Sequence, residues 1–100
     1  MKGFKEIIRE ARISKKIILR EVSASIGIDQ TIINKYELGE RKPTKEQVIK
    51  LANFYSLNTE DLIIAWKSDI LSYELCDEEN ASEILRLAED KVQYLKKKKS

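Results

Sequence analysis

Four polar side chains share one face of a helix that the sequence predicts from about Gln30 to Leu38. At about 100° per residue these side chains span about 140° of arc, and the opposite side of the helix is apolar. The polar face carries two amides, a hydroxyl and one ammonium, which are groups that suit hydrogen bonding to the edges of DNA bases. The residues predicted to read bases are Gln30, Thr31, Asn34 and Lys35.

This predicted reading helix is bracketed by residues that begin and end helices. Asp29 precedes it, where a carboxylate can accept hydrogen bonds from free backbone amides. Gly39 follows it, where a left-handed residue commonly ends a helix. A second short amphipathic helix comes before it, and the two are joined through Gly27. The stretch from Ile17 to Pro43 therefore predicts two helices packed across each other, a helix-turn-helix.

The same stretch resembles the Cro/repressor (XRE) type of helix-turn-helix domain, found in phage repressors and many small bacterial regulators. Caps, glycines and apolar positions fall at the family's spacing without a gap, and the resemblance covers about the first two thirds of the chain. It implies an all-α, five-helix domain that binds double-stranded DNA. The matching residues are Ile26, Gly27, Ile28, Asp29, Gln30, Thr31, Ile33, Tyr36, Glu37, Gly39, Arg41, Lys42 and Pro43.

The resemblance also implies an ion pair between Arg12 and Glu37, the glutamate near the end of the reading helix. If the pair is buried, removing one partner costs about 3 to 5 kcal/mol because the other charge is stranded. A surface pair contributes less than about 1 kcal/mol. The sequence leaves both alternatives open.

In relatives the loop after the reading helix runs along the sugar-phosphate backbone, so Arg41 and Lys42 are candidates for phosphate contacts. The start of the preceding helix departs from the family, because Ile18 and Leu19 replace the usual Ser or Thr and Gln. Either Ser14 caps a longer helix that begins earlier, or point charges take over the phosphate contact there. We favour the charges, which are Lys15, Lys16 and Arg20.

The net charge of +2 is unevenly distributed along the chain. Residues 1 to 57 hold 12 Lys and Arg against 7 Asp and Glu, a net of +5, whereas residues 58 to 100 hold 7 against 10, a net of −3. The basic excess therefore lies in the same part of the chain as the reading helix, as expected for a protein that neutralises phosphates there.

Three more helices are predicted around this pair. The first runs from Gly3 to about Ile13, and the fourth follows a capping box formed by Thr44 and Gln47. The fifth follows Asn58, a further cap, and continues to about Leu75.

The fifth helix is longer than the domain needs, and a last helix follows whose apolar residues repeat at intervals of 4, 3, 4 and 3 from Ala81 to Leu95. We predict a helix-turn-helix domain over residues 1–66 and a helical dimerisation appendage with a basic tail over residues 67–100. The alternative is an intramolecular hairpin that covers the extra apolar stripe. The predicted homodimer interface comprises Trp66, Ile70, Tyr73, Leu85, Ala88, Val92 and Leu95.

The sequence therefore predicts a regulator that binds a palindromic operator as a homodimer and needs no cofactor or metal. An enzyme is not expected, since the chain has no His and its lone cysteine, Cys76, lacks an obvious base. The charged N-terminus and the lack of a long apolar run predict a cytoplasmic protein. A phage-type repressor, an antitoxin-like autoregulator and a restriction-modification controller all fit. In the alternative function, the last helices bind a partner protein.

Overall fold

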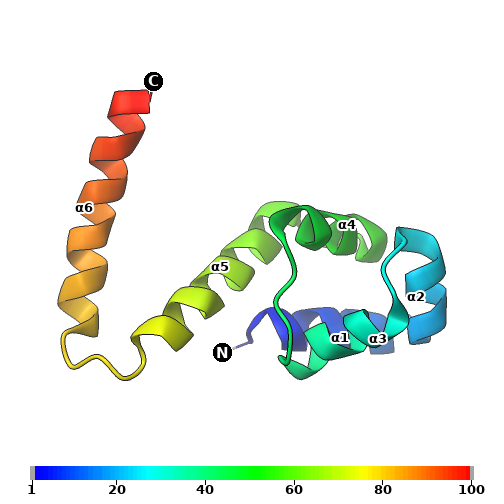
Figure 1. The fold of residues 1–100 in the computed structure, drawn as a ribbon. Coiled ribbons are helices and arrows are strands. Elements are labelled where there is room, and N and C mark those ends of the chain that lie inside the picture. Colours follow the sequence, from blue (N-terminus) through cyan, green and yellow to red (C-terminus); the bar gives the residue numbers. More distant parts are fainter. Residues whose placement is uncertain (1, 100) are drawn as a thin grey trace. The chain divides into compact units, whose positions relative to one another are not determined.

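The computed structural model describes residues 2–99 and is all-α, as the sequence predicts. Six helices follow one another within this range (Figure 1). They are α1 (Phe4–Ser14), α2 (Leu19–Ile26), α3 (Gln30–Leu38), α4 (Lys45–Tyr55), α5 (Thr59–Leu75) and α6 (Ala81–Lys99). None of the helices in this part of the chain is long and apolar enough to cross a membrane.

The helix boundaries follow from local capping chemistry. The Asp29 carboxylate accepts a hydrogen bond from the Thr31 amide at 2.7 Å and so begins α3. Gly39 ends α3 with φ at +77°, a conformation that side chains with a Cβ rarely adopt. The Thr44–Gln47 capping box begins α4, and the Asn58 side chain accepts from the Asp61 amide at 2.9 Å at the start of α5. These four caps were predicted from the sequence.

One alternative for the start of α2 is wrong. Ser14 is the last residue of α1, and its hydroxyl donates to the Ala11 carbonyl at 3.0 Å, so it does not cap the following helix. The chain turns through Lys16, which has a positive φ of 56°, and α2 begins with Ile18 as its N-cap residue. Because Ile18 offers no side-chain acceptor, α2 starts without a side-chain cap.

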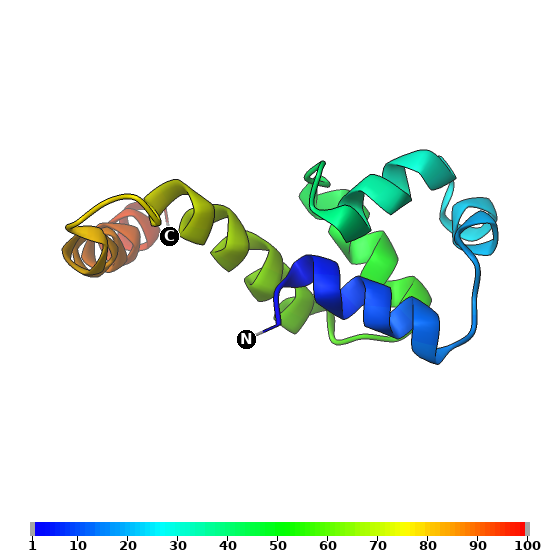
Figure 2. The same cartoon turned by 90° about the horizontal axis from the view of Figure 1, so that it is seen from below.

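The core lies among the first five helices. The reading helix α3 packs on α1 and α2, and α4 packs on the same two helices from another side (Figures 1 and 2). The apolar faces of these helices supply the buried residues, and α5 adds its first two turns. The buried apolar residues are Phe4, Ile8, Val22, Ile28, Ile33, Tyr36, Val48, Leu51, Ala52, Tyr55, Leu62 and Trp66.

The chain divides between Ile70 and Leu71 into two compact units, one helical turn later than the boundary expected after residue 66. Two contacts extend the first unit through this turn. Ile70 packs on the core, and the Asp69 carboxylate accepts a hydrogen bond from the Phe4 amide at 2.7 Å. Asp69 thus caps α1 from α5, where its negative charge also complements the positive end of the helix dipole.

The structure places the residues of the predicted dimer interface in two different environments. Trp66 is only 7% exposed and belongs to the core of the first unit, and Ile70 packs against that core. Tyr73 and the seam residues of α6 are exposed. Trp66 and Ile70 therefore stabilise their own domain. They lie four residues apart on α5, on the face of that helix that packs against the core.

Candidate nucleic-acid interface

The four residues predicted to read DNA bases all lie exposed on α3. The opposite side of the same helix is anchored in the core by Ile33 and Tyr36, which are 0% and 2% exposed. The polar face is therefore free to enter a groove while the apolar face fixes the rotation of the helix about its axis. An α-helix with one polar face fits the major groove of B-DNA, where base pairs are distinguishable by their hydrogen-bonding groups.

A buried ion pair ties α3 to α1. Arg12 donates from Nε to Glu37 Oε2 at 2.8 Å and from Nη2 to Glu37 Oε1 at 2.9 Å, a two-point geometry. Its third donor, Nη1, reaches the carbonyl of Ile17 at 3.1 Å. The Glu37 side chain is 2% exposed and that of Arg12 is 18% exposed, which corresponds to the buried alternative. The pair fixes the C-terminal half of α3 on the first helix and holds the turn before α2.

The hydrogen bond to the Glu37 carboxylate raises the pKa of Arg12 further above its ordinary value. The Arg12 guanidinium therefore stays charged at any physiological pH. Tyr55 lies in the same region, and burial together with the negative charge of Glu37 raises its pKa to about 12. The Tyr55 hydroxyl is buried and has no hydrogen-bond partner among residues 2–99. The ion pair is thus enclosed by a neutral phenol and the core.

A second set of hydrogen bonds fixes the loop after α3. The side-chain oxygen of Gln47 accepts from the Tyr36 hydroxyl at 2.8 Å and from the Thr44 amide at 2.9 Å. Gln47 thereby joins the reading helix to the start of α4 across the loop that carries Arg41 and Lys42. Both basic side chains are exposed. The burial of Tyr36 raises its pKa, so the phenol remains a hydrogen-bond donor at neutral pH.

The other three candidates for phosphate contacts lie between α1 and α2. Lys15 and Lys16 follow the last residue of α1, and Arg20 is in the first turn of α2. All three side chains are exposed. In the first turn of α2 the Glu21 and Val22 amides donate to the Ile18 carbonyl at 3.1 and 3.3 Å, so the three basic side chains lie beside the positive end of the helix dipole.

Two residues that position this interface were not assigned that role from the sequence. Gln47 was predicted only as half of a capping box, and its bond to Tyr36 joins residues 11 apart. Asp69 was not singled out, and its partner lies 65 positions away. No local pattern carries such contacts, because they arise only when helices meet in the fold.

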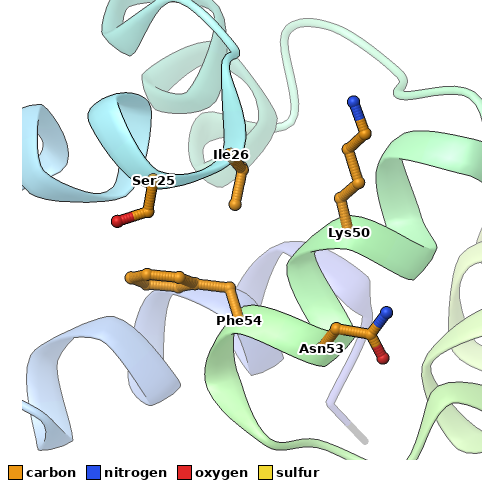
Figure 3. A pocket seen from close by; sticks show the side chains of 5 residues that line it. All are labelled: Ser25, Ile26, Lys50, Asn53 and Phe54. Atoms are coloured by element: carbon orange, nitrogen blue, oxygen red, sulfur yellow. The ribbon is translucent and has the colours of Figure 1, made fainter.

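A shallow cavity of about 530 Å³ lies between α2 and α4 (Figure 3). It is lined by Ser25, Ile26, Lys50, Asn53 and Phe54. None of these residues is a candidate for DNA contact. Within residues 2–99 no group of three or more Cys, Asp or Glu side chains is placed to hold a metal ion.

A capped polar helix, held by a buried ion pair on a compact helical core and followed by a basic loop, defines a helix-turn-helix DNA-binding domain. The comparison with known families agrees: the model described as Helix-turn-helix matches residues 8–62, more than half of the chain. The chain belongs to this family, in its Cro/repressor type. This is a class of DNA-binding regulators rather than of enzymes.

Two curated relatives, both called "Cryptic phage CTXphi transcriptional repressor RstR", are similar to the chain. The one from Vibrio cholerae is 33% identical over 60 residues, which is 60% of this chain and 54% of the relative. The one from Vibrio cholerae serotype O1, strain ATCC 39315 / El Tor Inaba N16961, is 33% identical over 75 residues, 75% of this chain and 57% of the relative. The chain thus spans a little over half the length of these relatives. No solved structure matches it.

Proposed function

We propose that the protein is a sequence-specific transcriptional repressor that binds a palindromic operator in double-stranded DNA as a homodimer. The observation that carries the proposal is the exposed polar face of α3, fixed in rotation by Ile33, Tyr36 and the Arg12–Glu37 pair. The two relatives are named as transcriptional repressors, which favours repression over activation.

In the proposed complex α3 lies in the major groove. Gln30 binds an adenine edge through its amide, Thr31 contacts a thymine methyl, and Lys35 favours guanine. Asn34 is the fourth reader. These assignments follow from the donor and acceptor groups of each side chain and from their common exposed face on α3.

Five exposed basic residues hold the duplex backbone in this proposal. Their contacts are independent of sequence, and each phosphate that they neutralise releases counterions, so binding weakens as the salt concentration rises. The proposed phosphate contacts are Lys15, Lys16, Arg20, Arg41 and Lys42.

A homodimer supplies the remaining geometry. Two α3 helices related by a two-fold axis enter successive major grooves about 34 Å apart, and a palindromic site follows from that symmetry. We propose that the C-terminal helices make the subunit contact, since they carry apolar residues that their own unit leaves exposed.

The test begins with selection of bound DNA from a random pool at moderate salt. We expect a palindromic consensus, and then a specific effect of Gln30→Ala on that site. The variant loses about 1 to 3 kcal/mol of binding free energy and tolerates other bases at one position of each half-site. Lys42→Ala weakens operator and random DNA alike, because a phosphate contact carries no base information.

Lys50→Ala is the matched control for Lys42→Ala, because it removes an exposed lysine of α4 that is not a candidate for phosphate contact. It should leave both affinities unchanged. Equal losses on operator and random DNA for Gln30→Ala would remove the base-reading role of Gln30. Failure to recover any consensus would refute the proposed sequence-specific function and favour a module that binds a partner protein.

A further inference from the structure

The last helix carries an apolar seam that its own unit does not cover. Leu85, Val92 and Leu95 are 46%, 45% and 54% exposed. All three belong to the apolar stripe of α6, whose residues are spaced alternately four and three positions apart. Ala88 completes the repeat between them. α6 is a single helix from Ala81 to Lys99 (Figure 1), so the seam residues follow one another along one helix axis. A helix with such a stripe is stable in water when another helix packs on it.

The charges of the same segment change sign along its length. Residues 81–90 of α6 hold three acidic residues against Arg86, a net of −2, and residues 77–79 just before the helix hold three more; residues 91–99 hold five lysines and no acid, a net of +5. The helix therefore has an acidic first half, extended by the acids just before it, and a basic second half. A second copy of α6 placed head to tail matches acid to base at both ends, whereas a parallel copy places acid beside acid and lysine beside lysine.

We propose that α6 pairs with α6 of a second copy of this chain in the antiparallel direction, and that its two charged halves select this orientation. In this pair the Leu85 side chain packs against Leu95 of the partner subunit, and Ala88 packs against Val92 of the partner subunit. In the heptad repeat of α6, Leu85 and Val92 occupy a positions, and Ala88 and Leu95 occupy d positions. Each of these contacts therefore joins an a residue of one helix with a d residue of the other, as in antiparallel helix pairs. Lys96–Lys99 lie near the acidic half of the partner helix.

This proposal rests on the proposed function and deepens it by fixing how the two DNA-binding units are held. Each first unit is joined to α6 at the N-terminal end of that helix. In an antiparallel pair these two ends are separated by the length of α6, roughly 28 Å for its 19 residues. A parallel pair would bring the two ends together.

The first experiment measures the dimer dissociation constant of the full chain by analytical ultracentrifugation without DNA. Neutralising the four lysines in Lys96→Gln, Lys97→Gln, Lys98→Gln and Lys99→Gln should raise Kd at least about tenfold, because attractive pairs are lost at both ends. The wild-type Kd should also rise between 0.05 M and 1 M NaCl. The control, Lys45→Gln with Lys50→Gln, neutralises lysines of α4 and should leave Kd unchanged.

The second experiment determines the orientation by disulfide formation in a Cys76→Ser background. Ser82 and Lys96 flank the seam on the same side, two heptads apart. When Ser82→Cys and Lys96→Cys proteins are mixed under mild oxidation, we expect the mixed disulfide to predominate. A parallel pair would instead give Ser82→Cys dimers and Lys96→Cys dimers, and would bind more tightly after the lysines are neutralised.

Four outcomes overturn the proposal: a monomeric chain, a Kd that the glutamine substitutions do not change, tighter pairing after those substitutions, or a predominance of the two like disulfides. An unchanged Kd would mean that the charges stabilise only the isolated helix, through their interaction with its dipole, and do not contribute to pairing. Failure of the proposed function gives a different result, the absence of a DNA consensus, because the Gln30 face is tested separately from the pairing of α6.

Discussion

Breaking the Arg12–Glu37 pair from one side should destabilise the DNA-binding unit severely. In Arg12→Leu, the Glu37 carboxylate, whose side chain is 2% exposed, loses both of its charged hydrogen bonds, at 2.8 and 2.9 Å. The Ile17 carbonyl loses its donor as well. Stranding a buried charge costs about 3 to 5 kcal/mol. Since domains of this size are stable by about 5 to 15 kcal/mol, the midpoint temperature should fall by roughly 12 °C or more.

The double variant Arg12→Leu with Glu37→Leu should be more stable than Arg12→Leu alone, because removing both partners leaves no stranded charge. A double-mutant cycle then gives a coupling free energy of about 2 kcal/mol or more. Urea unfolding followed by tryptophan fluorescence is the appropriate assay, because the single tryptophan, Trp66, is buried in the first unit. The signal therefore reports on the DNA-binding unit and not on α6.

An exposed ion pair provides a matched comparison for the Arg12–Glu37 pair. Lys2→Gln is the control, because it removes an exposed pair with Glu10 and should change little. If Arg12→Leu lowers the free energy of unfolding by less than about 1 kcal/mol, the argument from a stranded buried charge is wrong.

Three further predictions concern positions that shape the domain. Gly39→Ala should lower the free energy of unfolding by about 1 to 2 kcal/mol, because the residue has a positive φ and a new Cβ would lie 3.1 Å from the Lys5 side chain. Gly27→Ala has the same sign of φ but open space around it, so it should lower the stability less when both variants are compared by thermal unfolding. Tyr55→Phe should change the free energy of unfolding at pH 7 by less than about 1 kcal/mol, since its hydroxyl has no partner among residues 2–99. The wild type should lose stability between pH 10 and 12, because the phenol ionises in the unfolded state before it ionises in the folded state, and the variant should lose less. Equal alkaline losses in the two proteins would contradict this. Gln47→Ala should weaken binding to all DNA sequences by loosening the basic loop, whereas Asn53→Ala on the same helix should not, as measured by fluorescence anisotropy.

Much of the candidate site could be predicted because its determinants are local in sequence. The Asp29 cap, the left-handed Gly39 and the Thr44–Gln47 box each act within a few residues, and the amphipathic period of α3 identifies its exposed face. The alternative that Ser14 caps α2 failed because the last turn of α1 used the same hydroxyl. Local patterns can name a capable residue without deciding which of two adjacent helices it serves.

The assignment of Trp66 and Ile70 to a subunit interface shows the corresponding limit for apolar residues. Both follow a stripe that continues along α5, and the periodicity cannot show where the domain's own core ends. The Asp69 cap on α1 likewise had no sequence signal, since its partner lies 65 positions away.

The sequence by itself determined the helices, their caps, the polar face of α3 and the family to which the chain belongs, because helical period and capping are short-range properties of the chain. Only the tertiary structure decided that the Arg12–Glu37 pair is buried, that Gln47 joins the reading helix to α4, and that Trp66 belongs to the core. These outcomes depend on solvent exclusion and on distances between residues far apart in the chain. Both are set by how the helices pack.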